Sequence, residues 1–113
     1  DTEYDPKSEI VVTVGGSEAI DLAIRGIIEE GDEVLICEPS FVCYRPIAEL
    51  SGGRVISIET KAEDDFRLTA SELKEKISDR TKLLILPFPN NPTGAVMEKE
   101  DLEKIEQKVR DIN

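Results

Sequence analysis

The segment Lys82-Leu-Leu-Ile-Leu-Pro-Phe-Pro-Asn-Asn-Pro-Thr-Gly94 joins a short apolar run to a loop of unusual composition. The run 82–86 has the length and apolar character of a buried β-strand. The loop that follows contains X-Pro bonds and ends in a glycine that can take a positive φ, so its backbone is tightly constrained. Such a loop is more demanding than a plain connection needs, and an asparagine held in it can donate an amide N–H to a ligand oxygen.

Three other strand-like runs precede this one, and helix-like segments separate them. The runs are Ile10–Val14, Glu33–Cys37 and Arg54–Ile58. A helix opens at Ser17 with isoleucines at helical spacing, and a second helix follows Pro39. Strands that alternate with helices predict a parallel sheet with right-handed crossovers, so the chain is assigned to the α/β class.

The last two helices have clear sequence signals. Thr69 and Glu72 have the spacing of a capping box, and Leu68 and Leu73 are placed to form the accompanying hydrophobic staple. The final helix is predicted to begin near Glu98. Its apolar residues recur on one face, which predicts packing against the sheet. These residues are Leu102, Ile105, Val109 and Ile112.

Composition narrows the class of protein. The chain has 113 residues, 39% of them hydrophobic and arranged in periodic blocks, which predicts one folded domain. The 25 acidic residues outnumber the 14 basic ones and give a net charge of −11. Nucleic acids and anionic membranes bind basic faces, so neither is expected as a partner.

Other absences point to a cytoplasmic protein without a metal. No apolar run approaches the ~20 residues of a membrane span, and no hydrophobic leader opens the sequence. Cys37 and Cys43 are the only cysteines and there is no histidine, so we expect two buried thiols in a reducing compartment rather than zinc ligands. The start at Asp1, without an initiator methionine, indicates a fragment or a trimmed product.

The turn Gly15-Gly16-Ser17-Glu18 lies between a predicted strand and a helix. Two glycines allow a tight turn, and the start of a helix presents free N–H groups at its positive end, so the turn can bind a phosphate. Ser17 can instead simply cap the helix, with Glu18 favoured by the dipole. From the residues alone, both interpretations remain open.

Glu38-Pro39-Ser40-Phe41 follows the predicted strand 33–37. An aromatic ring just beyond a strand end can lie against a planar ligand, although a core phenylalanine after a turn is the simpler interpretation. In open α/β sheets, ligands bind beyond the carboxyl ends of the strands. The turn at residues 15–18, this segment and the asparagine loop are all expected at that edge.

Taken together and in this order, four motifs resemble the class I and II aminotransferases, the aspartate-aminotransferase-like pyridoxal-phosphate enzymes of fold type I. The motifs are Val12–Ile20, Gly31–Val34, Glu38–Phe41 and Asn90–Gly94. The resemblance spans nearly the whole chain, and the Asn-Pro-Thr-Gly piece is its most specific part. It implies a three-layer α/β/α fold with a mostly parallel sheet, part of the large domain of these enzymes.

The resemblance also implies roles for individual residues toward pyridoxal 5'-phosphate. Gly16 and Ser17, with Glu18, would hold the phosphate, Phe41 would stack on the pyridine ring, and Asn91 would hydrogen-bond the ring 3-oxygen. In the family, the peptide bonds that correspond to 38–39 and 91–92 are cis, so we predict that both are cis here.

The catalytic residues of the family have no counterpart in this chain. The Schiff-base lysine, the aspartate that pairs with the pyridine nitrogen and the substrate-binding arginine are all expected beyond residue 113. No catalytic residue and no metal ligand is therefore assigned. Ser71–Lys74 matches a bare Ser-x-x-Lys pattern, but it falls inside a capped helix, so Lys74 is assigned to a solvated helix face.

The activity implied for the parent is transfer of an amino group between an amino acid and a 2-oxo acid, in a homodimer. Residues 1–113 would form the N-terminal part of the cofactor-binding large domain, truncated before the Schiff-base lysine. The isolated fragment is expected to be inactive and to self-associate, because the sheet would lack neighbouring strands. Whether it binds the cofactor is left open.

Other functions are compatible with parts of the pattern. A C–S lyase or a decarboxylase of the same fold would share every motif. A non-catalytic phosphate- or nucleotide-binding module would share only the turn at residues 15–18, and a purely structural fragment would bind no ligand. Competition between pyridoxal phosphate and nucleotides discriminates the aminotransferase fragment from the phosphate-binding module, whereas nothing in the pattern separates it from a lyase or a decarboxylase.

Overall fold

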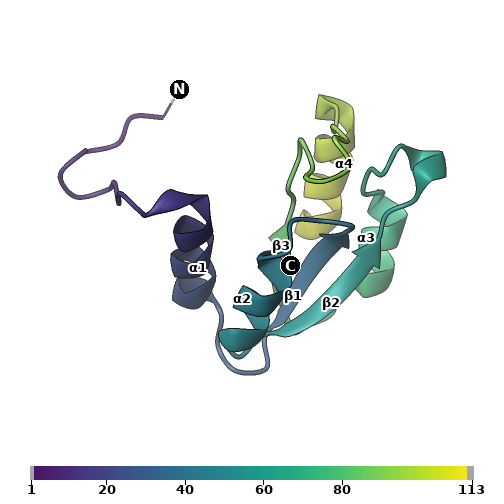
Figure 1. The fold of residues 1–113 in the computed structure, drawn as a ribbon. Helices are drawn as coiled ribbons and strands as arrows, with labels where there is room; N and C mark the ends of the chain where they lie inside the picture. Colours follow the sequence, from purple (N-terminus) through teal and green to yellow (C-terminus); the bar gives the residue numbers. More distant parts are fainter. Residues whose placement is uncertain (1, 112–113) are drawn as a thin grey trace.

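The computed structural model describes residues 2–111 as a parallel sheet with helices on both faces (Figure 1). Its strands are β1 (Glu33–Glu38), β2 (Arg54–Glu59) and β3 (Thr81–Ile85), in the order β2-β1-β3. Both neighbours of β1 run parallel to it, so the carboxyl ends of the strands lie at one edge of the sheet. This arrangement confirms the predicted α/β class and three of the predicted strands.

The sheet is centred on β1, whose residues 33–37 are all buried. Its register pairs Val34 with Val55 on one side and with Leu83 on the other. A central strand covered on both faces needs apolar side chains at successive positions, and the run Val-Leu-Ile-Cys supplies them. The sequence therefore specifies which strand is central through its unbroken hydrophobicity.

One face of the sheet is covered by α1 (Gly15–Ile27) and α2 (Tyr44–Leu50). Alternate β1 side chains point to this face and form a buried cluster with residues of the two helical segments. The members of this cluster are Ile24, Ile28, Val34, Ile36 and Ala48. The cluster fixes α1 against the sheet through its second half, while the first turn of α1 stays exposed.

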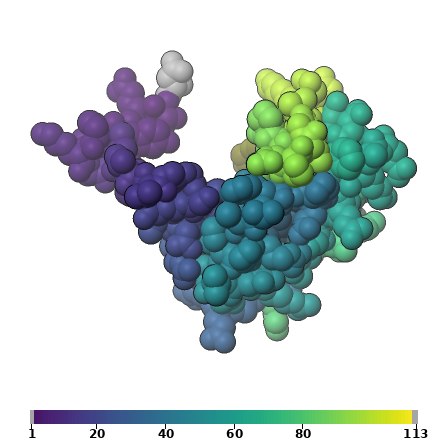
Figure 2. Space-filling model, in the orientation of Figure 1, coloured from purple at the N-terminus to yellow at the C-terminus, as the bar shows by residue number. Residues whose placement is uncertain are grey.

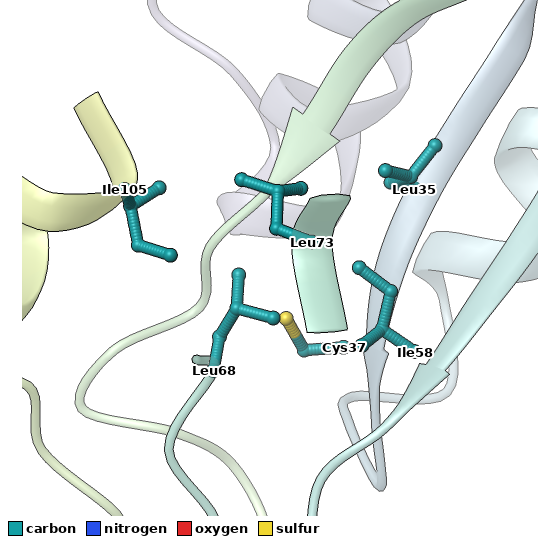
Figure 3. Close-up of a cluster of buried hydrophobic side chains, with 6 residues drawn as sticks. All are labelled: Leu35, Cys37, Ile58, Leu68, Leu73 and Ile105. Carbon is teal, nitrogen blue, oxygen red and sulfur yellow. The ribbon is translucent and has the colours of Figure 1, made fainter. Parts of the chain in front are cut away.

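The opposite face is covered by α3 (Ala70–Lys76) and α4 (Lys99–Arg110), with a short 3₁₀ turn, η1 (Ala62–Asp64), leading into α3. Figure 3 shows the buried cluster on this side. Its members are Leu35, Cys37, Ile58, Leu68, Leu73 and Ile105. Helices on both faces of the sheet give the three-layer α/β/α arrangement that the resemblance implied.

The predicted signals of α3 and α4 are largely confirmed. Thr69 accepts from the Glu72 N–H at 3.3 Å and the Glu72 carboxylate accepts from the Thr69 N–H at 2.9 Å, which completes the capping box. Leu68 and Leu73, the predicted staple, lie in one cluster. On α4 only the central Ile105 is buried. Leu102 and Val109 are 44% and 38% exposed, and Ile112 lies outside the described residues.

The predicted strand Ile10–Val14 is wrong. Residues 10–13 have no regular secondary structure, and Val12 and Val14 are 93% and 91% exposed. A β-strand needs a neighbour to satisfy its N–H and C=O groups, and no strand among residues 2–111 lies beside this segment. Figure 2 shows the N-terminal segment projecting from the body of the molecule instead.

The helices of the described chain are short, and the longest, α1, has 13 residues. Within residues 2–111, none combines the length and the apolar character that a membrane span requires.

Candidate functional site

Three segments singled out in the sequence converge at the carboxyl edge of the sheet. The Nδ2 amide of Asn90, in the loop after β3, donates to the Pro39 carbonyl in the loop after β1 at 2.8 Å. Ser17 Oγ, in the first turn of α1, lies 3.8 Å from Cys43 Sγ, just before α2. These contacts link the glycine turn and the asparagine loop, which are far apart in sequence, to the two ends of the segment 39–43 between β1 and α2.

The glycine turn forms the first turn of α1. Gly15 has φ = 80°, a conformation that strains other residues, and a Cβ built at Gly16 would meet no atom within 4 Å. The turn therefore faces open space. The first N–H groups of a helix have no acceptor within the helix, so the backbone here presents donors to that space. This donor set suits an oxyanion such as a phosphate.

Ser17 does not cap the helix, as one interpretation had supposed, whereas Glu18 does lie in the first turn, where the helix dipole favours an acidic residue. The N-cap residue is Val14, which makes no side-chain cap bond, so Ser17 lies inside the helix and its hydroxyl is directed to Cys43. The Glu18 carboxylate accepts the Val14 N–H and closes the turn. A carboxylate cannot donate, and the Glu18 N–H makes the first bond within the helix, to the carbonyl of the N-cap residue Val14, so Glu18 offers no donor to an anion.

Phe41 lies between β1 and α2 and is half-buried. Its ring makes a T-shaped contact with Tyr44, with the centroids 5.8 Å apart and the planes at 80°. Phe41 belongs to neither buried cluster, so it does not serve as a core residue. An aromatic ring held by one edge contact beside a sheet edge is available to a flat ligand.

The asparagine loop separates its two asparagines. Asn91 is exposed, and no hydrogen bond ties its side chain to another residue in the part of the chain that the structure describes. Asn90 is only 6% exposed, and its backbone closes the loop through bonds to Ala95 and Gly94, both 2.8 Å. The amide of Asn91 is therefore free to meet a ligand, whereas that of Asn90 is engaged within the protein.

Both peptide bonds that we predicted to be cis are cis: Glu38–Pro39 and Asn91–Pro92. A third cis bond, Phe88–Pro89, was not predicted. All three lie in the two loops that follow β1 and β3.

Sequence reasoning missed Asn90. The doubled asparagine was the available signal, but composition does not say which of two neighbours points inward. The structure answers this through burial: Asn90 reaches Pro39 across the sheet edge, and its Oδ1 atom is buried without a hydrogen-bond partner.

The other groups that could take part in chemistry, a thiol, a lysine and possible metal ligands, add nothing to the candidate site. Burial, with a smaller contribution from the charge of Glu72, raises the pKa of the Cys37 thiol to about 12, so Cys37 stays protonated. Lys74 is exposed on α3, as predicted. Among residues 2–111, no three His, Cys, Asp or Glu side chains are grouped closely enough to hold a metal ion.

The fold is a three-layer α/β/α arrangement around a parallel sheet, and the three segments lie at the carboxyl edge of that sheet, where ligands bind in open α/β folds. Residues 1–112 match the family described as aminotransferase class I and II. The chain belongs to this family.

Relatives and solved structures agree with this assignment. The chain is 42% identical over 105 residues to a putative aminotransferase, YugH, of Bacillus subtilis, and 44% identical over 103 residues to an aspartate aminotransferase of Pyrococcus abyssi. These alignments cover 93% and 91% of this chain but 27% and 26% of the relatives. The chain thus spans about a quarter of the length of the curated relatives that it matches.

The fold also matches solved aminotransferases. The aromatic aminotransferase of Pyrococcus horikoshii superposes with a TM-score of 0.90 at 44% identity, over 96% of this chain and 29% of that structure. A variant of the Thermus thermophilus aspartate aminotransferase gives 0.83 at 38% identity, over 88% of this chain and 27% of that structure. The likeness extends over nearly all the described elements, which confirms the expected fold.

Proposed function

We propose that this chain forms the cofactor-binding front part of the large domain of a pyridoxal-phosphate-dependent aminotransferase. The parent would transfer an amino group between an amino acid and a 2-oxo acid, as a cytoplasmic homodimer. The catalytic lysine would come from a part of the parent outside these 113 residues, so the isolated chain should not transaminate. The observation that supports the proposal best is the convergence of the three loop segments at one sheet edge, through Asn90–Pro39 and Ser17–Cys43.

The residues present fit the chemistry of the cofactor. Its phosphate matches the open N–H donors of the first turn of α1, to which the hydroxyl of Ser17 adds another donor. Phe41 offers an aromatic ring for the pyridine, and Asn91 offers an unengaged amide for the ring 3-oxygen. Because the whole chain carries a charge of −11, these local donors must hold the anionic phosphate against the overall field.

Each residue has a definite task in this proposal. When bound, the cofactor supplies an electron sink for the α-carbon of the amino acid. The α1 turn anchors the phosphate and so fixes the position of the ring. Phe41 limits the tilt of the ring and shields one of its faces from water, while Asn91 donates to the 3-oxygen and stabilises negative charge there.

Titration of the chain with pyridoxal phosphate, followed by absorbance, tests the proposal. We expect Asn91→Ala to weaken pyridoxal-phosphate binding about fivefold, as for the loss of one hydrogen bond of about 1 kcal/mol, without changing the affinity for inorganic phosphate. Ser17→Ala should weaken the binding of both pyridoxal phosphate and inorganic phosphate. Gln107→Ala removes an exposed amide on α4 and should change neither.

The competing functions give different results in the same titration. Equal binding of a nucleotide and of pyridoxal phosphate, unaffected by Asn91→Ala, would indicate a general phosphate-binding module. An empty turn even at high phosphate would indicate a structural piece without a ligand. Either result would overturn the proposal.

A further inference from the structure

We propose that Asn90 is a positioning residue that holds the loop of Phe41 and the loop of Asn91 at a fixed separation. The part of this inference that concerns the cofactor rests on the proposed function. Asn90 itself is 6% exposed and is not placed to contact a ligand directly. It would act through Phe41 and Asn91, the two residues that are proposed to contact the cofactor ring.

The side-chain amide of Asn90 makes two hydrogen bonds. Nδ2 donates to the Pro39 carbonyl at 2.8 Å and to Thr93 Oγ1 at 2.9 Å. Pro39 lies two residues before Phe41, and Asn90 lies one residue before Asn91. A shift of this amide would therefore move both residues relative to each other.

The bond to Pro39 is not needed to form the asparagine loop. The backbone of Asn90 already accepts from Gly94 and donates to Ala95, and Thr93 Oγ1 accepts a further bond from the Ala95 N–H at 3.2 Å. These contacts close the turn locally. The Asn90–Pro39 bond joins positions 51 residues apart, so its distinct effect is to connect two loops.

The other amide atom strengthens this interpretation. Asn90 Oδ1 is buried and has no hydrogen-bond partner, which costs free energy that a smaller apolar residue would avoid. Exchanging the oxygen and the nitrogen would set two acceptors, Oδ1 and the Pro39 carbonyl, against each other, so the network fixes the orientation. The amide at this position is explained by its two donated bonds rather than by packing.

Amide hydrogen exchange in the ligand-free chain tests the coupling without any cofactor. Asn90→Asp keeps the size of the side chain but replaces the donor with a carboxylate facing the Pro39 carbonyl. We expect exchange to become at least tenfold faster in both loops, at residue 44, whose N–H donates to the Phe41 carbonyl at 3.3 Å, and at residues 93–95, with no change at the centre of β1. Thr93→Val removes the acceptor within the asparagine loop only, so it should affect 93–95 and leave residue 44 unchanged.

A second variant covers the case in which the aspartate prevents folding. Asn90→Ala removes the donors and the unpaired acceptor together and adds no charge, and it should give the same two-loop pattern. Faster exchange confined to 93–95, or a uniform increase that includes β1, would show that Asn90 supports only its own turn or the fold in general. Both results overturn the proposal.

Pyridoxal-phosphate titration then separates this inference from the proposed function. Asn90→Asp should weaken the binding of pyridoxal phosphate but not that of inorganic phosphate. Its effect should shrink severalfold when Asn91→Ala is already present, because both changes act on one interaction. If Asn90→Asp gives the two-loop pattern but the unmodified chain takes up no pyridoxal phosphate, the loop coupling stands and the cofactor proposal fails. If the unmodified chain binds the cofactor but Asn90→Asp leaves exchange at residue 44 unchanged, the positioning role fails.

Discussion

At the residue scale, the two cysteines show how strongly position controls chemistry. Cys37 is 1% exposed in the cluster beneath α3, where burial and, to a smaller extent, the charge of Glu72 raise its pKa from 9.0 to about 12. Cys43 is half-buried beside Ser17 at the sheet edge. The sequence predicted two buried thiols, and only Cys37 meets that description fully.

The raised pKa of Cys37 predicts a loss of stability in alkaline solution. The native state holds this proton more tightly than the unfolded chain, so the contribution is present below the unfolded pKa near 9 and is lost as pH rises toward about 12. Unfolding in urea at several pH values measures it. We expect the free energy of unfolding to fall more steeply above pH 9 in the unmodified chain than in Cys37→Val.

The Cys37→Val control isolates this thiol from the lysines and tyrosines that titrate in the same range. Parallel stability curves for the two proteins between pH 9 and 12 would contradict the prediction. The total difference should amount to a few kcal/mol, since one pKa unit corresponds to about 1.4 kcal/mol.

The candidate site was predictable at residues where the backbone itself is unusual. The glycines and prolines of the turn and the two loops indicate an unusual backbone geometry in the sequence itself. Both cis bonds predicted from the resemblance are present. The sequence did not predict that Asn90 is buried and hydrogen-bonded while Asn91 is exposed. It depends on which side chain reaches Pro39 across the sheet edge, and no local pattern encodes that contact.

At the scale of elements, a helix start that has a local sequence signal was predicted correctly, whereas a strand that needs a tertiary neighbour was not. The start of α3 was predictable because a capping box satisfies its N–H groups within four residues. The segment 10–14 has a β-branched composition as favourable as that of a real strand, yet it does not pair. Strand formation depends on a neighbour that the segment itself does not contain.

The one buried side chain of α3 is that of Leu73. Leu73 is fully buried between α3 and the sheet, so Leu73→Ala should lower the free energy of unfolding by about 2–5 kcal/mol. Leu50→Ala makes the same chemical change at the end of α2, where the side chain is 73% exposed, and should cost less than about 1 kcal/mol. Urea unfolding followed by circular dichroism measures both. Equal losses would show that α3 is not anchored through Leu73.

At the scale of the whole molecule, the sequence pattern predicts the layers of the fold but not how completely those layers cover one another. Alternation of helix and strand was enough to predict a parallel sheet, and the unbroken apolar run of β1 identifies the strand covered on both sides. Nothing in the pattern indicates how much apolar surface stays uncovered. In the described chain, β3 pairs with β1 alone, and an apolar groove between α1 and β3 opens along its free side.

That groove predicts self-association of the chain. It is lined by Ile20, Ala23, Ile24 and Ile27 of α1 and by residues 83–87. Apolar patches and unpaired strand edges favour contact between copies, whereas a charge of −11 on each copy opposes it. Sedimentation velocity should therefore show oligomers whose proportion rises with salt, because about 1 M salt shortens the screening length to about 3 Å.

A pair of lysine variants tests whether the groove is the contact surface. Ile27→Lys places a charge in the groove, at a side chain that is 44% exposed, and should shift the population toward monomer. Val42→Lys adds the same charge at a side chain that is 78% exposed and does not line the groove, so it should leave the oligomers largely intact. Because both variants add the same charge, a difference between them reports the loss of an apolar contact in the groove rather than a general change in charge repulsion between copies. A monomer at all salt concentrations in the unmodified chain would exclude self-association, and equal effects of both lysines would place the contact elsewhere.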